Sequence, residues 1–256
     1  MQTRQNEDTA AAVWMDAMKM FARAQPSGFS RDGAHGTSQV ISGAAMPLLN
    51  GVFSSAREPD AAEIAAFAGS PELRSMPWSV QVRGERFDPR IADTAAAHGL
   101  ARRSALPFML KSLSQADAAD AEDGASKVRP VGGDESALYQ AMLAAGYEGP
   151  PSLFTPMCLP SVLDHPAMRA YVAEEAGEPV ATSFGVFLGD HVAVFNIAVL
   201  PAHRRRGHGR AATAAVLRDG YATGARTAFL HSSTMGVPLY ESMGFHIAEN
   251  WTTFIS

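Results

Sequence analysis

Hydrophobic and polar positions along the second half of the chain form short runs of two kinds. Some runs are apolar or alternate residue by residue, which is typical of strands, and others have apolar residues three and four apart, which is typical of helices. The two kinds follow one another, so the pattern predicts a mixed α/β fold. The strand-like runs are Lys127–Val131, Arg169–Glu174, Pro179–Leu188, His191–Leu200, Ala225–His231 and His246–Ile255, and the helix-like runs are Asp134–Gly146, Arg206–Gly220 and Val237–Met243.

The run His191–Leu200 is apolar at nearly every position. A strand without a polar face is buried on both sides, so we expect this one to lie in the centre of a sheet. Pro201 ends it, because proline has no N–H group to donate to a neighbouring strand. Gly189-Asp190, just before the run, predicts a hairpin turn from the preceding strand.

The segment Gln115–Ser126 contains no aromatic or β-branched residue, and it carries four acidic residues. It cannot bury enough apolar surface to offset the entropy lost on ordering, so we expect a linker there. An exposed, acidic, alanine-rich helix is the alternative. The linker would divide the chain into residues 1–114 and 127–256.

Composition narrows the classes of function. The chain has 21 Lys and Arg against 26 Asp and Glu, a formal net charge of −5, so it is a poor candidate for a general nucleic-acid binder, which needs a basic surface. Cys158 is the one cysteine, which excludes an intrachain disulfide and a cysteine-rich zinc site, and we predict no metal site. No apolar run approaches the roughly 20 residues that span a bilayer, and the polar start does not fit a signal peptide. We therefore expect a cytoplasmic protein that binds neither nucleic acid nor membrane.

A turn rich in arginine and glycine lies between the predicted central strand and the helix after it. It reads Arg204-Arg205-Arg206-Gly207-His208-Gly209-Arg210. N–H groups at a helix start favour anions, glycines let an anion approach the backbone, and arginines donate charged hydrogen bonds. The turn lacks the lysine of a P-loop and the third glycine of the dinucleotide fingerprint. It predicts a pyrophosphate site; a basic loop that only caps the helix is the alternative.

Two motifs carry a resemblance to a known family. The stretch Arg204–Gly209 resembles the acyl-CoA-binding motif Arg/Gln-x-x-Gly-x-Gly/Ala of the GNAT N-acetyltransferase superfamily, and Leu239–Phe245 is similar to that family's Leu-Tyr-x-x-x-Gly-Phe motif. A helix and a strand separate the two, as in the family. The resemblance implies a GNAT-like fold for residues 127–256 and acetyl-CoA as the cosubstrate.

The resemblance also implies roles for individual residues. The backbone of Ala198, Val199 and Leu200 would bind the pantetheine arm of acetyl-CoA, and the turn Arg204–Arg210 would bind its pyrophosphate. Tyr240 would protonate the leaving thiolate as a general acid. A tyrosine that only packs in the core is the alternative.

The sequence departs from the family pattern at two places. Ser233 stands where many members have an asparagine, so we expect a weaker contact to the cofactor arm. No Asp or Glu follows His191 within the central strand, so no general base is evident. His191, Asn196 and His231 are the candidates, and a water chain or an already neutral amine would remove the need for a base.

The first half echoes the second in pattern, which indicates an internal duplication; an unrelated small α/β domain is the alternative. The matching strand, helix and strand are Trp78–Val82, Asp88–His98 and Arg103–Leu113. This copy would be degenerate, because Ala95 stands where Tyr240 does and Ser54–Asp60 contains no glycine-rich turn. Thr9–Ala24 has the pattern of an amphipathic helix, which we expect to pack within this half.

These motifs predict an enzyme that transfers an acetyl group from acetyl-CoA directly to a primary amine of a small molecule or peptide. The amine itself is not identified by the sequence, and we expect Glu148–Ala167 to shape its site. One alternative is a catalytically silent acyl-CoA-binding sensor or scaffold. Another is a nucleotide-binding protein of a different fold. A homodimer is compatible with the sequence.

Overall fold

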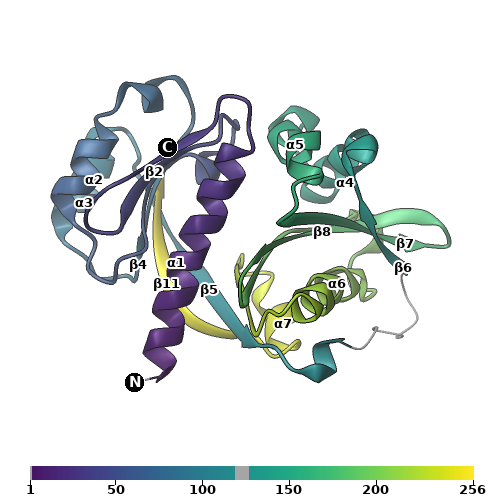
Figure 1. Ribbon diagram of the computed structural model, residues 1–256. Helices are drawn as coiled ribbons and strands as arrows, with labels where there is room; N and C mark the ends of the chain where they lie inside the picture. Colours follow the sequence, from purple (N-terminus) through teal and green to yellow (C-terminus); the bar gives the residue numbers. More distant parts are fainter. Residues whose placement is uncertain (1, 119–126) are drawn as a thin grey trace. The chain divides into compact units, whose positions relative to one another are not determined.

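The computed structural model describes residues 2–118 and 127–256 (Figure 1). Contacts divide the chain into two compact units. Unit 1 comprises Met1–Met109, His231–Met235 and Ile247–Ser256, and unit 2 comprises Leu110–Leu230 and Gly236–His246. Of the predicted linker, Gln115–Ala118 form a 3-10 helix (η3), and residues 119–126 lie outside the described residues.

Unit 1 is built on a sheet whose strands lie in the order β1-β2-β3-β4-β11-β5. Strands β3 and β4 are parallel, and helix α2 connects them in the sequence. The elements are α1 (Gln2–Arg23), β1 (Phe29–Asp32), β2 (Thr37–Ile41), η1 (Pro47–Leu49), β3 (Gly51–Ser54), α2 (Ala61–Ala68), η2 (Pro71–Ser75), β4 (Ser79–Arg83), α3 (Pro89–Ala97), β5 (Arg102–Ser112) and β11 (His246–Ile255).

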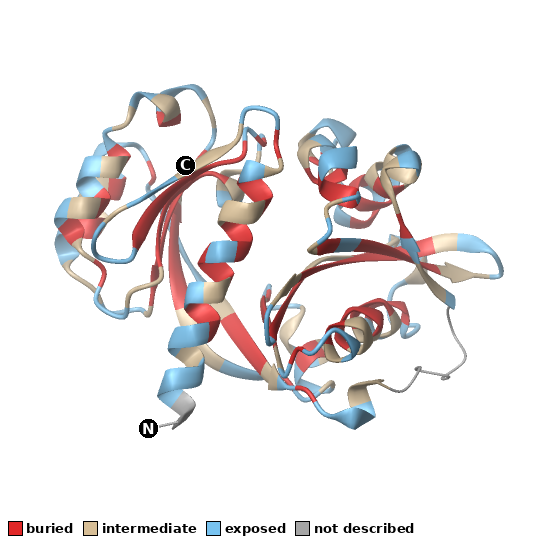
Figure 2. Cartoon of the chain, in the orientation of Figure 1, coloured by how far each residue is buried: buried red, intermediate tan, exposed pale blue. Residues whose placement is uncertain are grey.

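Both faces of this sheet are covered, because successive strand residues point to opposite sides. On β3, Val52 belongs to a core cluster with residues of α2 and α3, whereas Phe53 packs against Trp14 of α1, with 5.7 Å between the ring centroids. Figure 2 shows α1 with both buried and exposed residues along its length. The predicted amphipathic helix is therefore confirmed, and it packs within its own unit.

The last strand of the chain belongs to unit 1 rather than to unit 2. Residues Trp251–Phe254 of β11 pair antiparallel with Val80–Arg83 of β4, and Phe254 joins the core cluster. Arg83 is almost completely buried and forms ion pairs with Glu249 of β11 and Asp8 of α1. Residues 247–256 therefore contribute to the core of unit 1, although the sequence pattern grouped them with residues 127–246.

Unit 2 has the strand order β10-β9-β8-β7-β6. Helix α4 packs on β8 and β9 from one face, and α6 packs on β7, β8 and β9 from the other (Figure 1). The elements are β6 (Lys127–Val131), η4 (Gly133–Glu135), α4 (Ser136–Tyr147), η5 (Pro151–Leu153), η6 (Thr155–Cys158), α5 (Pro160–Leu163), β7 (Met168–Glu175), β8 (Glu178–Leu188), β9 (His191–Val199), η7 (Pro201–His203), α6 (His208–Ala222), β10 (Thr227–His231) and α7 (Val237–Glu241).

The mixed α/β fold predicted from the sequence is confirmed, and each run predicted in the second half forms a strand or helix of the expected kind. The hairpin at Gly189-Asp190 is also confirmed: Leu188 pairs with His191, and Gly189 has a φ of 59°. The sequence pattern did not predict β1, β2, α2 or α5. Across the described residues, the structure contains no helix with the length and apolar character needed to cross a membrane.

Candidate active site

The central strand of unit 2, β9, is paired with β10 over only part of its length. Thr227–Phe229 pair in parallel with His191–Ala193, and the pairing stops there although β9 runs on to Val199. Among the described residues, β9 beyond Ala193 therefore has no pairing with β10 on this side.

A bulge in β9 follows the point where the pairing with β10 ends. Opposite β8, Thr182 pairs with Ala198 but Phe184 pairs with Phe195, so β9 contains one extra residue. Asn196 takes up the left-handed conformation, with a φ of 54°, and its carbonyl accepts a 2.8 Å hydrogen bond from Thr182 Oγ1. A bulge bends its strand and redirects the backbone.

The three residues predicted to bind a pantetheine arm do not all direct their backbone N–H groups to the same side of β9. The N–H of Leu200 donates to Val180 O at 2.9 Å, so it is already used in pairing with β8. Backbone groups of successive residues in a strand alternate in direction. The N–H of Ala198 therefore also faces β8, and the N–H of Val199 faces the other side. Of the three predicted residues, Val199 has the N–H positioned for a ligand, and Leu200 does not.

The arginine- and glycine-rich turn leads into α6 as the sequence predicted. Gly207 has a φ of 91° and no atom within 4 Å of the place where a Cβ would stand. The helix begins at His208, and the N–H of Ala211 makes its first intrahelical bond, to Gly207 O at 3.0 Å. N–H groups of the first turn thus point out of the helix end, which is the geometry of an anion site.

The structure gives the arginines of this turn different roles. Arg204 donates to Gly146 O at 2.9 Å and to the Glu148 carboxylate at 2.8 Å, so its guanidinium fastens the turn to the end of α4. Arg206 lies 3.4 Å from Glu175 Oε2. Arg210 donates to Ser242 Oγ at 2.7 Å. The side chain of Arg204, which the sequence assigned to phosphate binding, is therefore engaged within the protein.

Three motif residues meet where β9 ends. A Cβ added to Gly209 would lie 3.4 Å from side-chain atoms of both Val199 and Leu239. The start of α6 therefore approaches the end of β9 and the first turns of α7 closely, and glycine at position 209 makes this approach possible. Tyr240 is the next residue of α7. Within unit 2, the structure thus brings the end of β9 and the start of α6 against α7, the helix that carries Tyr240.

Tyr240 is held in a largely apolar setting. It is 9% exposed, its ring packs against Phe245 with 5.8 Å between centroids, and the Phe245 N–H donates to Tyr240 O. Burial raises the pKa of its hydroxyl well above the usual value, and the neighbouring Tyr147 raises it further. Tyr240 therefore carries its proton at neutral pH, as a proton donor must.

None of the three candidate general bases has both the position and the chemistry that a base would need. His191 bonds Asp190 Oδ1 at 2.7 Å at the opposite end of β9, about 26 Å along the strand from Val199. His231 belongs to unit 1, where it packs against aromatic side chains; burial lowers its pKa to about 3. Asn196 has an amide that does not titrate. None of the three is supported as a base.

Ser233 also lies in a segment of unit 1, His231–Met235, so it is not among the residues brought together within unit 2.

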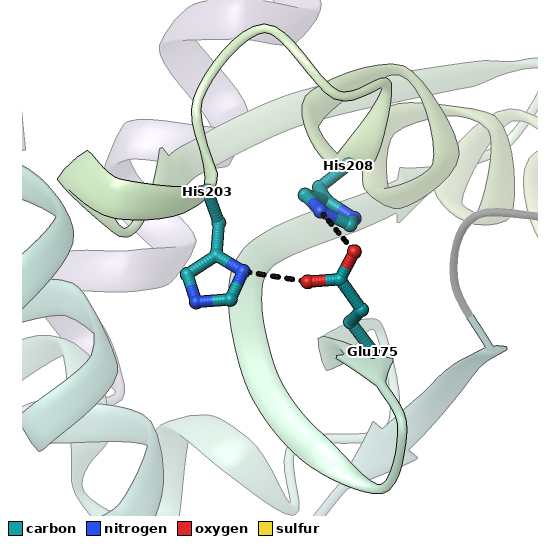
Figure 3. Close-up of side chains that lie close together, drawn as sticks. All are labelled: Glu175, His203 and His208. Carbon is teal, nitrogen blue, oxygen red and sulfur yellow. Dashed lines mark hydrogen bonds and ion pairs between the residues drawn. The ribbon is translucent and has the colours of Figure 1, made fainter.

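Two features of unit 2 were missed in the sequence. Tyr147, which stacks on Phe154 with ring centroids 5.6 Å apart, lies one residue beyond the predicted end of its helix. A cluster of two histidines and a glutamate lies at the turn (Figure 3). His203 and His208 are five residues apart, a spacing that could have signalled a metal site, but Glu175 is 28 residues before His203.

Comparison with known proteins identifies a family for part of the chain and a fold for nearly all of it. Residues 137–245 match the sequence model of the acetyltransferase (GNAT) family. The structure resembles a GCN5-related N-acetyltransferase from Kribbella flavida, with a TM-score of 0.66 and 19% identity over 96% of this chain and 95% of that one. It also resembles a conserved protein of unknown function from Staphylococcus epidermidis, with a TM-score of 0.64 and 12% identity over 90% of this chain and 93% of that one. Comparison with curated protein sequences gives no match.

At these identities the two solved structures support the fold alone. Their similarity in fold covers nearly the whole chain, beyond the residues of the family match. The family match covers α4 to α7, the elements that carry both sequence motifs. The resemblance predicted from the sequence is therefore confirmed: residues 137–245, a little under half of the chain, match the acetyltransferase (GNAT) family.

Proposed function

We propose that the chain transfers an acetyl group from acetyl-CoA to a primary amine. Membership of residues 137–245 in the GNAT family supports acetyl transfer in general; the donor, the amine and the residue roles are our proposal. The observation that carries it is the meeting of Val199, Gly209 and Leu239 in unit 2. This meeting supports the proposal because Val199 has an outward-facing strand N–H, Gly209 lies at a helix start suited to anions, and Leu239 precedes Tyr240 in α7.

The turn and strand would hold the donor. N–H groups at the start of α6 would bind the pyrophosphate, assisted by Arg205 and, once they leave Glu175 and Ser242, by Arg206 and Arg210. The N–H of Val199 would bond to the pantetheine arm. Arg204 would act indirectly, because its bonds to Gly146 and Glu148 fix the turn against α4.

The reaction would be a direct transfer. The amine nitrogen forms a bond to the acetyl carbon, the bond from that carbon to sulfur breaks, and the leaving thiolate receives a proton. Tyr240 would supply this proton, since burial keeps its hydroxyl protonated. A covalent intermediate on Cys158 is not needed and is disfavoured, because this thiol is buried and its pKa is raised to about 12. The amine would arrive neutral or first lose its extra proton to water. As the amide forms, the nitrogen gives up one further proton to water and Tyr240 regains one from water, so no net proton is consumed.

The acceptor site would lie beside the end of α4. Gly146 is so close to β9 that a Cβ there would lie 2.7 Å from the Cβ of Ala198, so α4 reaches the ligand-facing part of that strand. The stacked rings of Tyr147 and Phe154 follow directly. We propose that these rings and the segment 148–167 contact the amine substrate.

The test is release of free CoA thiol from acetyl-CoA in the presence of a panel of primary amines. Tyr240→Phe should lower kcat by about 10²-fold or more while the affinity for acetyl-CoA stays within a few-fold, because a general acid acts in the transition state. Tyr221→Phe is a matched control, since Tyr221 lies in the last turn of α6 and its ring stacks on Arg226. Equal turnover by Tyr240→Phe and the wild type would return Tyr240 to a packing role.

One observation favours a second candidate, a catalytically silent acyl-CoA-binding module: none of the three predicted bases is placed for catalysis. Such a module would bind acetyl-CoA but release no CoA with any amine. The same assay separates the two functions.

A further inference from the structure

A group of side chains with the chemistry of metal ligands lies beside the arginine- and glycine-rich turn. Glu175 ends β7, His203 ends η7 and His208 begins α6. Figure 3 shows the carboxylate of Glu175 directed toward both imidazole rings. Glu175 Oε2 lies 2.8 Å from His203 Nδ1, and Glu175 Oε1 lies 3.6 Å from His208 Nε2. The three donor atoms are all within 4.8 Å of one another.

The backbone around these residues is fixed by local contacts. The His203 N–H donates to Leu200 O at 2.8 Å, and the residue after it, Arg204, is bonded to the end of α4. The His208 side chain is fully buried. Glu175 is followed by a tight turn in which Ala176 and Gly177 both have positive φ. Three potential ligands therefore converge from elements whose positions are set independently of any ion.

The donor set and its spacing suit a late first-row divalent ion. Zinc takes histidine nitrogens at about 2.0–2.1 Å and carboxylate oxygens at about 2.0–2.2 Å in tetrahedral geometry, which puts donors about 3.3–3.5 Å apart. The distances of 2.8 Å and 3.6 Å, each to a different oxygen of the Glu175 carboxylate, lie on either side of that separation, and the three donors, one per residue, lie within 4.8 Å of one another. We propose that Glu175, His203 and His208 bind a divalent transition-metal ion such as Zn²⁺, with the fourth position open to water or to an external ligand.

Arg206 is the competitor of this ion, because its guanidinium lies 3.4 Å from the Glu175 oxygen that also bonds His203. A bound ion would displace Arg206 from the carboxylate. The affinity is therefore expected to be lower than at sites built from cysteine thiolates, and binding would free Arg206 for other anions. The proposal concerns the ion alone and does not depend on acetyl transfer.

The test is a zinc titration of the full chain, freed of any histidine tag, in competition with a chromogenic chelator. Wild-type protein should bind one equivalent of Zn²⁺. His203→Gln should weaken binding by more than about tenfold, since loss even of a residue that only supports a ligand costs that much. Position 203 is chosen because His203 is partly exposed, whereas replacement of the buried His208 risks the fold. His246→Gln, at an exposed histidine outside the cluster, is the matched control.

Glu175→Gln should also weaken binding by more than about tenfold, because an amide is a poor zinc ligand. Co²⁺ gives a second readout: its visible absorption should have the intensity of a four-coordinate site in the wild type and lose it in His203→Gln. The proposal is overturned if wild-type protein binds no zinc, if His203→Gln and Glu175→Gln keep wild-type affinity, or if His246→Gln weakens binding equally.

Discussion

His231 makes unit 1 sensitive to acid in a way that can be calculated. Its ring lies within 5.1 Å of the rings of Trp14, Phe108 and Trp251, measured between centroids, and its Nε2 has no hydrogen-bond partner among the described residues. Burial lowers its pKa from 6.5 to about 3. The folded protein therefore keeps this histidine neutral at pH values where the unfolded chain binds a proton.

The sign and size of the change in the free energy of unfolding with pH follow from proton linkage. Below pH 6.5 the unfolded state binds more protons than the folded state, so the free energy of unfolding falls as the pH falls, until the folded pKa is reached. With an unfolded pKa of about 6.5 and a folded pKa of about 3, His231 alone lowers the free energy of unfolding by about 2 kcal/mol between pH 7 and pH 5. His231→Phe should remove this contribution. At pH 7 it should be neutral or stabilising, because it also removes a buried polar atom without a partner.

The assay is urea unfolding of the wild type and His231→Phe at pH 7 and pH 5. Where two transitions appear, the comparison uses the one in which tryptophan fluorescence reports Trp14 and Trp251 of unit 1. His35→Gln, at an exposed histidine of the same unit, is the control and should keep the wild-type dependence on pH. If His231→Phe loses as much stability as the wild type between pH 7 and pH 5, then His231 is not buried in its neutral form. If the folded His231→Phe variant also loses the proposed acetyl transfer, then His231 takes part in catalysis, contrary to its position in unit 1.

Two substitutions of glycine test the site itself. Gly207→Glu should weaken acetyl-CoA binding by more than tenfold in isothermal titration, because a carboxylate would occupy the proposed anion site. Gly224→Glu is the matched control: Gly224 also has a positive φ and open space for a side chain, so both variants carry about 1–2 kcal/mol of backbone strain, but only the first should lose affinity. Gly146→Ala should cost about 1–3 kcal/mol in urea unfolding, since its methyl group would lie 2.7 Å from Ala198 Cβ. Gly149→Ala should cost less, because its methyl would meet only movable side-chain atoms; equal costs would contradict the close approach of α4 to β9.

Local patterns predicted the elements of unit 2 because each strand there is a compact apolar run and each turn has a residue suited to it. Gly189 and Gly207 adopt the positive φ angles that their turns require. Strand β2 was not predicted, because it is not a compact apolar run. Thr37, Ser38 and Gln39 are polar but buried. Their place in the sheet depends on hydrogen-bond partners that the local pattern does not show. One such partner is Asp32, which accepts a hydrogen bond from Ser38.

The position of β11 could not be read from the sequence either. Its alternation predicts a strand, but the partner of Trp251 is Arg83, far away in the sequence, and no local signal identifies it. Once paired, Phe254 enters the core of unit 1 and Glu249 neutralises the buried Arg83. The same limit applies within the candidate site. The sequence showed a row of arginines, but it did not show that Arg204 fastens the turn to Gly146.

The proposed binding of acetyl-CoA by unit 2 at the start of α6 is tested most directly by a thermal melt with saturating ligand. Ligand at 100 times its dissociation constant adds about 2.7 kcal/mol, which for a protein of this size raises Tm by about 5–10 °C. We predict this shift for the wild type with acetyl-CoA, a much smaller one with ATP or NAD, and at most about half of it for Gly207→Glu at the same acetyl-CoA concentration. No shift in the wild type, or an equal shift in Gly207→Glu, would contradict the assignment of the site.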